Sequence, residues 1–274
     1  MLSLLALASS LCWGTSDFFA GLFSRRRPAV AVVGWTQALA FVVLCAVVAT
    51  QRDHIAWSGW PLWSVAAGIS GLTGLLCFYT ALSTGTMGVV APIAALGVAV
   101  PVLLGVATGD EPSPWTWVGI LVAVVGVTLA SGPELSGDVS TRPVVLAAVA
   151  AVGFGLALFC LDRGARTSTL MTLWGMRCTS VLVFTVVALV TRSLGGVAAR
   201  EVPSLLVIGC GDLAANGLFA VASSRGEVSV ASVLGSLYPV MTILLARVVL
   251  RERLRPIQQV GAVLSLAGAA VIAL

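Results

Sequence analysis

The sequence predicts an all-α integral membrane protein with ten transmembrane helices, arranged as two inverted five-helix repeats. Three observations predict this class: the composition, the spacing of the apolar runs, and an internal repeat. Of the 274 residues, 59% are hydrophobic and only 9% are charged, whereas soluble domains are about 45–50% apolar and about 25% charged. A soluble chain this apolar could not cover its core with polar surface. The composition therefore argues against a soluble enzyme, a nucleic-acid binder and a disordered protein.

The apolar runs have the length of membrane-spanning helices, which need roughly 20 residues each. Interruptions by proline, glycine or charge give ten predicted spans: 2–23, 29–49, 61–82, 87–108, 114–131, 143–161, 169–191, 203–223, 228–249 and 256–274. Six of them begin at a proline, where a missing N–H does no harm: Pro28, Pro61, Pro114, Pro143, Pro203 and Pro256. Tryptophans gather at span ends, as in an aromatic belt: Trp57, Trp60, Trp63, Trp115 and Trp117. Glycines in the third span allow close helix approach.

An internal repeat relates the two halves of the chain. The fifth and tenth spans share one spacing of a proline and two glycines: Pro114, Gly119 and Gly126 against Pro256, Gly261 and Gly268. Upstream, Glu111 matches Glu252, and Trp35 in the second span matches Trp174 in the seventh. These matches imply an offset of 139–142 residues. The consistent offset favours a duplication.

The repeat predicts two domains, residues 1–132 and 143–274, each with five spans. Because five is odd, the second copy must enter the membrane from the opposite side. Inverted repeats are the architecture of many secondary transporters, whose substrate site lies near the midplane at the repeat interface.

Short motifs, in order along the whole chain, resemble the EamA-type members of the drug/metabolite transporter (DMT) superfamily. They are Trp13-Gly14, Phe78-Tyr79 with Ala81-Leu82, the run from Gly88 to Leu96, Tyr238-Pro239, and Glu252-Arg253-Leu254. The resemblance implies a central cavity and transport of small metabolites, often outward, across the plasma membrane. Gln37 departs from the family pattern, since the second span of such proteins often carries Arg there.

Three charged residues lie deep inside predicted spans: Asp17, Arg177 and Asp212. A charge at mid-helix costs roughly 2.5–3.5 kcal/mol on insertion scales, so such residues face the bundle interior and are functional candidates. We expect Asp17 and Asp212 to couple transport to a proton or another ion. Alternatively, Asp212 forms a structural ion pair with Arg177, and Asp17 pairs with the arginines at 25–27.

The predicted substrate site combines Arg177, which could bind a substrate carboxylate bidentately, with polar and aromatic residues inside the spans. The other expected members are Trp13, Gln37, Tyr79, Trp174, Asn216 and Tyr238. We expect Pro92 and Pro239 to break the fourth and ninth helices and expose backbone groups near the cavity.

The leading hypothesis is secondary-active transport, with export, of small metabolites such as amino acids, by alternating access. Alternatives are a proton-coupled multidrug or organic-cation antiporter, a membrane scaffold, and an intramembrane aspartyl protease. The protease is suggested only by the GxGD string from Gly209 to Asp212, with Asp17 as the second acid. The chain has no G-x4-GK[ST] phosphate loop, and its single histidine cannot build a typical zinc site. We therefore expect no enzyme activity, no cofactor and no metal.

The expected partners are a small-molecule substrate, a coupling ion and the lipid bilayer, with no nucleic acid, for a monomer or a homodimer. Orientation stays open at this level. Ten arginines lie in the loops opposite the termini and four on the terminal side, so the positive-inside rule places both termini outside. The family is usually drawn with both termini in the cytoplasm.

Overall fold

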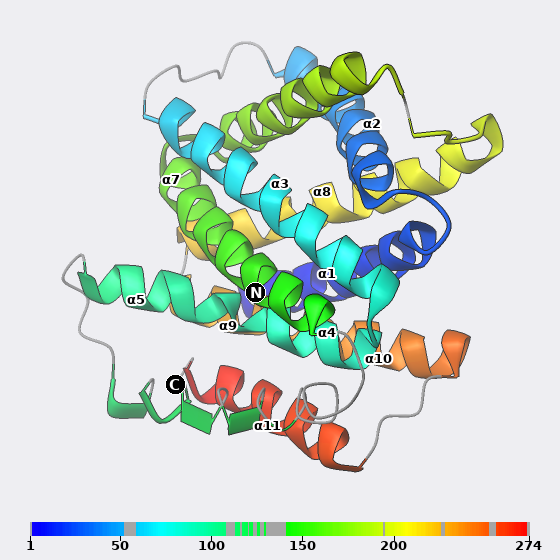
Figure 1. The fold of residues 1–274 in the computed structure, drawn as a ribbon. Coiled ribbons are helices and arrows are strands. Elements are labelled where there is room, and N and C mark those ends of the chain that lie inside the picture. Colours follow the sequence, from blue (N-terminus) through cyan, green and yellow to red (C-terminus); the bar gives the residue numbers. More distant parts are fainter. Residues whose placement is uncertain are drawn as a thin grey trace.

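The computed structural model describes residues 2–51, 59–107, 113–115, 117–119, 121–122, 125–126, 129, 141–193, 195–225, 228–251 and 256–272. These residues form an all-helical protein, with no strand among them (Figure 1). The helices are α1 (Leu2–Ser24), α2 (Ala29–Thr50), α3 (Pro61–Thr84), α4 (Met87–Ala95), α5 (Ala99–Ala107), α7 (Arg142–Thr191), α8 (Val202–Arg225), α9 (Val228–Gly235), α10 (Tyr238–Leu245) and α11 (Pro256–Ile272). Where residues 114–129 of the predicted fifth span are described, they are helical.

Four helical segments are long and apolar enough to cross a membrane, judged by length and composition: Ala29–Thr50, Pro61–Thr84, Arg142–Thr191 and Ala199–Arg225. The third of these, α7, has 50 residues and measures about 75 Å at 1.5 Å per residue. That length is enough for two crossings of a hydrocarbon core about 30 Å thick. The all-α membrane class expected from the composition is therefore supported by helix length as well.

The loop predicted between the sixth and seventh spans, residues 162–168, is wrong in its length. The helical hydrogen bonding of α7 runs through residues 162–167, and the chain bends only at Ser168, whose φ of −158° and ψ of 108° are extended. The charges at Asp162, Arg163 and Arg166 resembled a loop. In the structure Asp162 is buried, and its Oδ2 accepts a 3.1 Å hydrogen bond from Nε of the exposed Arg166 one turn later. This i, i+4 pairing lets charged residues continue the helix.

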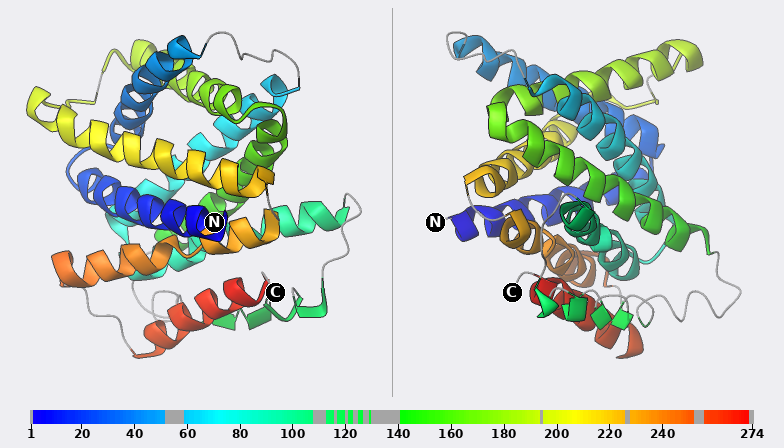
Figure 2. Two further views of the ribbon diagram at one scale, coloured as in Figure 1. Left: turned by 180° about the vertical axis from the view of Figure 1, so that it is seen from behind. Right: turned by 90° about the vertical axis from the view of Figure 1, so that its left-hand side faces the viewer.

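The helices pack as a bundle with a second group beside it. α3 packs along α7, α1 along α8, and α2 against both α7 and α8. α4, α5, α9 and α10 cross below α1 in Figure 1, and α11 packs on α4 and α9 at the base, next to the described pieces of residues 114–129 (Figures 1 and 2).

Two of the apolar segments are interrupted near their middle. The 3₁₀ turn Leu96–Val98 separates α4 from α5, one turn after Pro92. Residues 236–237 separate α9 from α10, and Pro239 occupies the first turn of α10. The Ser236 N–H donates to the Ser232 carbonyl at 2.8 Å. The interruptions therefore fall at equivalent places in the two halves of the chain.

Two apolar clusters form the core. The first, which we term the loop-side cluster, contains Phe18, Val33, Phe78, Leu82 and Met87, all completely buried. It lies where α1 and α3 end and α2 begins. The second cluster, at the other ends of the same helices, includes Ala6, Leu44, Ala67, Leu161 and Phe219.

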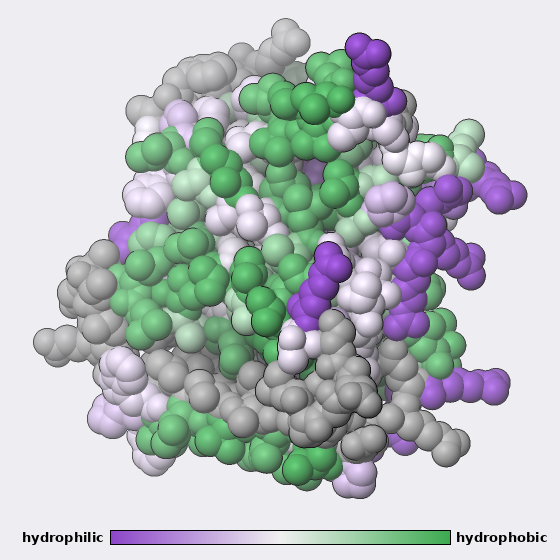
Figure 3. Space-filling view, in the orientation of Figure 1, coloured by the Kyte–Doolittle hydropathy of each residue, from purple (hydrophilic) through white to green (hydrophobic). Residues whose placement is uncertain are grey.

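An ion pair closes the surface beyond the loop-side cluster. Both Nε and Nη2 of Arg27 donate to Glu201 Oε1 at 3.2 Å, and Nη2 lies 3.0 Å from Oε2. Glu201 Oε2 also accepts the Ala198 N–H at 2.8 Å. The connection between α7 and α8 is thereby tied to the short loop between α1 and α2. Hydrophilic residues gather along this edge, and apolar residues cover much of the rest of the face shown in Figure 3.

Close backbone approach between α3 and α7 generates a first prediction. A methyl group added at Gly153 would lie 2.8 Å from the Ser70 carbonyl oxygen and 3.0 Å from Gly74 Cα, both backbone atoms. We expect Gly153→Ala to lower the free energy of unfolding by about 1–3 kcal/mol, because overpacking forces the helices apart. Thermal unfolding of the detergent-purified protein measures it.

The matched control is Gly71→Ala on α3, where the nearest atom would be Ala157 Cβ at 3.4 Å, an ordinary contact. Its unfolding temperature should stay near that of the wild type. Equal loss of stability in both variants would contradict the packing explanation.

Candidate substrate cavity

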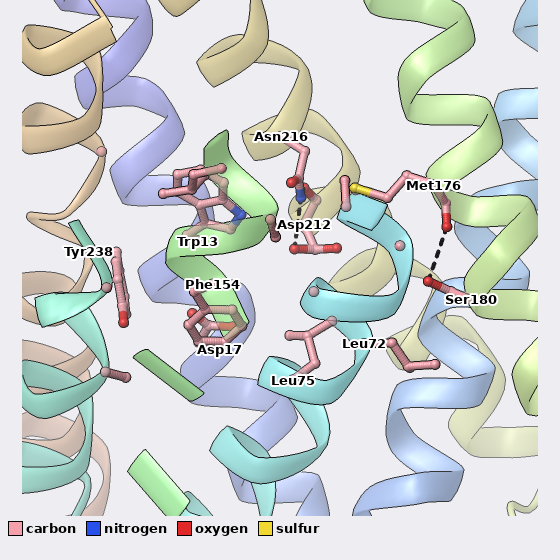
Figure 4. Close-up of a pocket in the computed structure, with 18 of the residues that line it drawn as sticks. Trp13, Asp17, Leu72, Leu75, Phe154, Met176, Ser180, Asp212, Asn216 and Tyr238 are labelled. Carbon is pink, nitrogen blue, oxygen red and sulfur yellow. Dashed lines mark hydrogen bonds between the residues drawn. The ribbon is translucent and has the colours of Figure 1, made fainter. Parts of the chain in front are cut away.

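A cavity lies in the middle of the bundle, lined by residues of α1, α2, α3, α4, α7, α8, α9 and α10 and of the 3₁₀ turn after α4. Its empty volume, counting the space at its opening, is about 810 Å³. Most of its walls are apolar or small side chains. The lining residues that carry the argument below are Gln37 and Arg177 and, labelled in Figure 4, Trp13, Asp17, Leu72, Leu75, Phe154, Asp212, Asn216 and Tyr238.

The most polar wall is built around Arg177 on α7 and Asp212 on α8. Arg177 Nη2 lies 2.7 Å from Asp212 Oδ2, and both residues are buried, with 2% and 6% of their surface exposed. This ion pair was one of the two alternatives for Asp212. Because a charge in a low-dielectric interior is costly alone, the pair must form for α7 and α8 to pack.

Gln37 and Asn216 complete the hydrogen bonding of that pair. Arg177 Nη1 donates to Gln37 Oε1, and Gln37 Nε2 donates to Asp212 Oδ2 at 3.4 Å. Asn216 Nδ2 donates to Asp212 Oδ1 at 3.1 Å and to the Asp212 carbonyl at 2.7 Å (Figure 4). Both carboxylate oxygens of Asp212 are therefore occupied. We term Arg177, Asp212, Gln37 and Asn216 the Arg177 network.

Two glycines of the GxGD string explain how α8 reaches its partners. A Cβ at Gly209 would collide with the Thr36 carbonyl oxygen on α2, and one at Gly211 would collide with Ser16 Oγ on α1. The glycines thus serve close helix packing. The Asp212 carboxylate is hydrogen-bonded to Arg177, Gln37 and Asn216, and Asp17 is not among its partners in the described part of the chain.

Asp17 forms a separate polar point on α1. Tyr79 Oη donates to Asp17 Oδ1 at 3.1 Å, and both side chains are buried. Asp17 is close enough to Tyr238 and Asp212 for electrostatic interaction with each. It does not pair with the arginines at 25–27: Arg27 binds Glu201 instead.

Two of the predicted binding residues lie outside the lining. Tyr79 stands behind Asp17, against Phe78, whose ring centroid is 6.0 Å away. Trp174 packs against Phe41 and Trp60, with ring centroids 6.1 and 6.5 Å apart. The proximity of Trp174 to Arg177 in sequence suggested a shared face. The tryptophan instead joins an aromatic group at the end of the bundle.

Sequence reasoning missed the apolar lining, including Leu72, Leu75 and Phe154, and it missed the buried Asp162. The signal for the lining was available, since Leu72 lies 140 residues before Asp212 and Phe154 lies 141 after Trp13. Among the residues that the structure describes, no group of three or more His, Cys, Asp or Glu could hold a metal ion.

The sequence pattern of the EamA-like transporter family matches residues 1–132 and, again, residues 141–274. The chain belongs to the EamA-like transporter family. The family assignment from motif order is thereby confirmed, and with it a membrane transporter of the DMT superfamily. The family assignment identifies a transporter, but it leaves the substrate, the direction and the mechanism of transport open.

The solved structures agree on the fold. One protein crystal structure matches with a TM-score of 0.74 and 20% sequence identity, covering 100% of this EamA-like chain and 98% of the other. No sequence among the curated proteins matches the chain.

The Arg177 network generates a second prediction, on stability. Arg177→Met leaves the buried Asp212 carboxylate without its cation, and Asp212→Asn leaves the guanidinium without its anion. We expect each change to cost about 3–5 kcal/mol, and the double variant to cost less than the sum of the two. Unfolding midpoints in detergent measure this cycle.

The Arg27–Glu201 pair, whose side chains are 29% and 19% exposed, is the control for that cycle. Arg27→Met and Glu201→Gln should each cost no more than about 1 kcal/mol, because water screens the pair. Additive losses at Arg177 and Asp212 would show that the two residues are not coupled.

Proposed function

We propose that the protein is a secondary-active transporter that exports small polar metabolites, such as amino acids or related compounds, across the plasma membrane by alternating access. The observation that carries the proposal is the central cavity, which places buried charges on helices from both halves of the chain. Buried charges that face a cavity inside a membrane bundle mark substrate or ion pathways. Export and the plasma membrane rest on family resemblance.

The lining supports two duplicated halves around one site. Five pairs of lining residues lie 140 positions apart: Asp17 with Ala157, Gln37 with Arg177, Leu72 with Asp212, Ala95 with Gly235, and Val98 with Tyr238. Two halves that contribute equivalent positions to one cavity fit an inverted repeat whose interface holds the substrate. We extend this to ten spans, five in each of residues 1–132 and 143–274.

The position of the cavity suits alternating access. The loop-side cluster shares Leu72, Leu75 and Tyr238 with the cavity lining, and on α3 it continues beyond Leu75 to Phe78 and Leu82. Beyond that cluster, the Arg27–Glu201 pair ties the loops together. Opening of this side would therefore have to separate the cluster and break the ion pair, while the second cluster closes the opposite side.

Flux through proteoliposomes tests the proposal and forms a third prediction. A panel of amino acids, sugars, nucleosides and lipophilic cations, with and without a pH gradient, should contain solutes whose flux exceeds that of empty liposomes. Leu75→Trp fills the cavity and should reduce this flux by on the order of tenfold, because lining residues shape the site.

Ile69→Trp on the same helix is the matched control, since Ile69 is 53% exposed on the outer surface. It should transport like the wild type. Absence of flux for the whole panel, in protein that remains folded, would contradict the transporter proposal. Flux in Leu75→Trp equal to that of the wild type would show that the substrate does not pass through this cavity.

A further inference from the structure

The two polar points of the cavity differ in what they can still bind. In the Arg177 network, both Asp212 oxygens and both terminal nitrogens of Arg177 have partners. The remaining Arg177 nitrogen, Nε, is buried and has no partner in the described part of the chain. At the two terminal nitrogens, a substrate carboxylate would have to displace Gln37 or Asp212.

Asp17 is less occupied. Its Oδ1 accepts the Tyr79 hydroxyl, and among the described residues no other hydrogen bond reaches its carboxylate. Asp17 also lines the cavity, so one oxygen is available to a molecule inside it. The polar groups near Asp17 come from several helices: Asp212 on α8, and the hydroxyls of Tyr79 on α3 and Tyr238 on α10.

The formal charge of the lining also favours a cation. Asp17, Asp212 and Arg177 are its charged members. With both acids ionised they leave one uncompensated negative charge. Asp212 is neutralised by Arg177 at 2.7 Å, so that charge belongs to Asp17. A buried charge without a partner is costly, and a bound monovalent cation would remove that cost.

Tyr238 supplies an independent observation. Its hydroxyl is buried, has no hydrogen-bond partner in the described part of the chain, and belongs to a side chain that lines the cavity. Its ring packs edge-on against Phe78, with centroids 6.2 Å apart, which fixes its direction. Buried hydroxyls normally find a partner. The Tyr238 hydroxyl and the second Asp17 oxygen both lack a partner among the described residues, so both can accept a hydrogen bond from an N–H donor.

The remaining walls fit an apolar body. Trp13 and Phe154 provide aromatic surfaces, and Leu72 and Leu75 provide aliphatic ones (Figure 4). An aromatic face also attracts a cation within about 6 Å of its centroid. The cavity thus combines one site for a positively charged group with a larger apolar volume.

We propose that the cavity selects organic amines with an apolar body, whose ammonium group binds between the Asp17 carboxylate and the Tyr238 hydroxyl. The Arg177 network then holds α2, α7 and α8 together and does not bind substrate. This inference rests on the proposed transport function and changes its substrate class from amino acids to amines. It favours an amine over the corresponding amino acid, because a substrate carboxylate would have to displace Gln37 or Asp212 from the terminal nitrogens of Arg177.

Binding to detergent-purified protein tests the proposal and forms a fourth prediction. The probes share one body and differ in the head group: 2-phenylethylamine, 2-phenylethanol and 3-phenylpropanoate. The amine should raise the unfolding temperature and give a saturable titration, while the alcohol and the acid should do neither. Asp17→Asn should weaken amine binding by on the order of tenfold or more, because it removes the negative charge of the lining carboxylate that has a free oxygen. Tyr238→Phe should weaken it less.

Asp162→Asn is the control, because Asp162 is a buried acid outside the lining. It should bind the amine like the wild type. Asn at position 17 can still accept the Tyr79 hydroxyl, and an unchanged elution profile and unfolding temperature verify its fold. Equal amine binding in Asp17→Asn would overturn the proposal. So would binding of 3-phenylpropanoate that depends on Arg177.

The flux panel separates this inference from the transport proposal. If amines neither bind nor move while other solutes are transported, the amine site is wrong and the transport function stands. If no solute of any class is transported, the transport function fails, and the amine site is then tested by the titration alone. Amine binding that is lost in Asp17→Asn would support the site. No amine binding to the wild type would overturn it.

Discussion

The buried ion pair between Arg177 and Asp212 is the interaction on which the rest of the structure depends. Neither charge is tolerated alone between apolar helices, because desolvation of an unpaired ion costs several kcal/mol. At 2.7 Å the pair requires α7 and α8 to approach, and Gln37 adds α2 to the same contact. Gly209 permits the approach, since any side chain there would strike the backbone of α2.

The same interaction explains why the centre of the bundle is a cavity with two kinds of polar site. The Arg177 network joins α2, α7 and α8 along one wall, whereas Asp17 on α1 keeps an oxygen open to the interior. The two apolar clusters flank this level and share residues with the lining. For the proposed alternating access, one cluster would have to open while the other stays closed.

The helical membrane fold and the buried charges could be predicted from the sequence, whereas the partners of those charges could not, for identifiable physical reasons. Deep charges stand out because lipid penalises them, so Asp17, Arg177 and Asp212 were found from their positions inside the predicted spans. Their partners could not be: Tyr79 reaches Asp17 across 62 positions, and such contacts depend on packing. Asp162 was missed because neighbouring arginines imitate a loop, although an i, i+4 pair keeps α7 helical. The apolar lining carried no chemical signal except its 140-residue spacing.

Alternating access at the central cavity is the core claim, and cysteine accessibility tests it most directly. In a variant without the six native cysteines, a single cysteine at Leu75 would be exposed to a membrane-impermeant thiol reagent in right-side-out and in inside-out vesicles. We expect modification from both sides, with a substrate gradient shifting the balance between them, and protection by bound substrate. Modification from one side only, unchanged by any gradient, would contradict a carrier that alternates around this cavity.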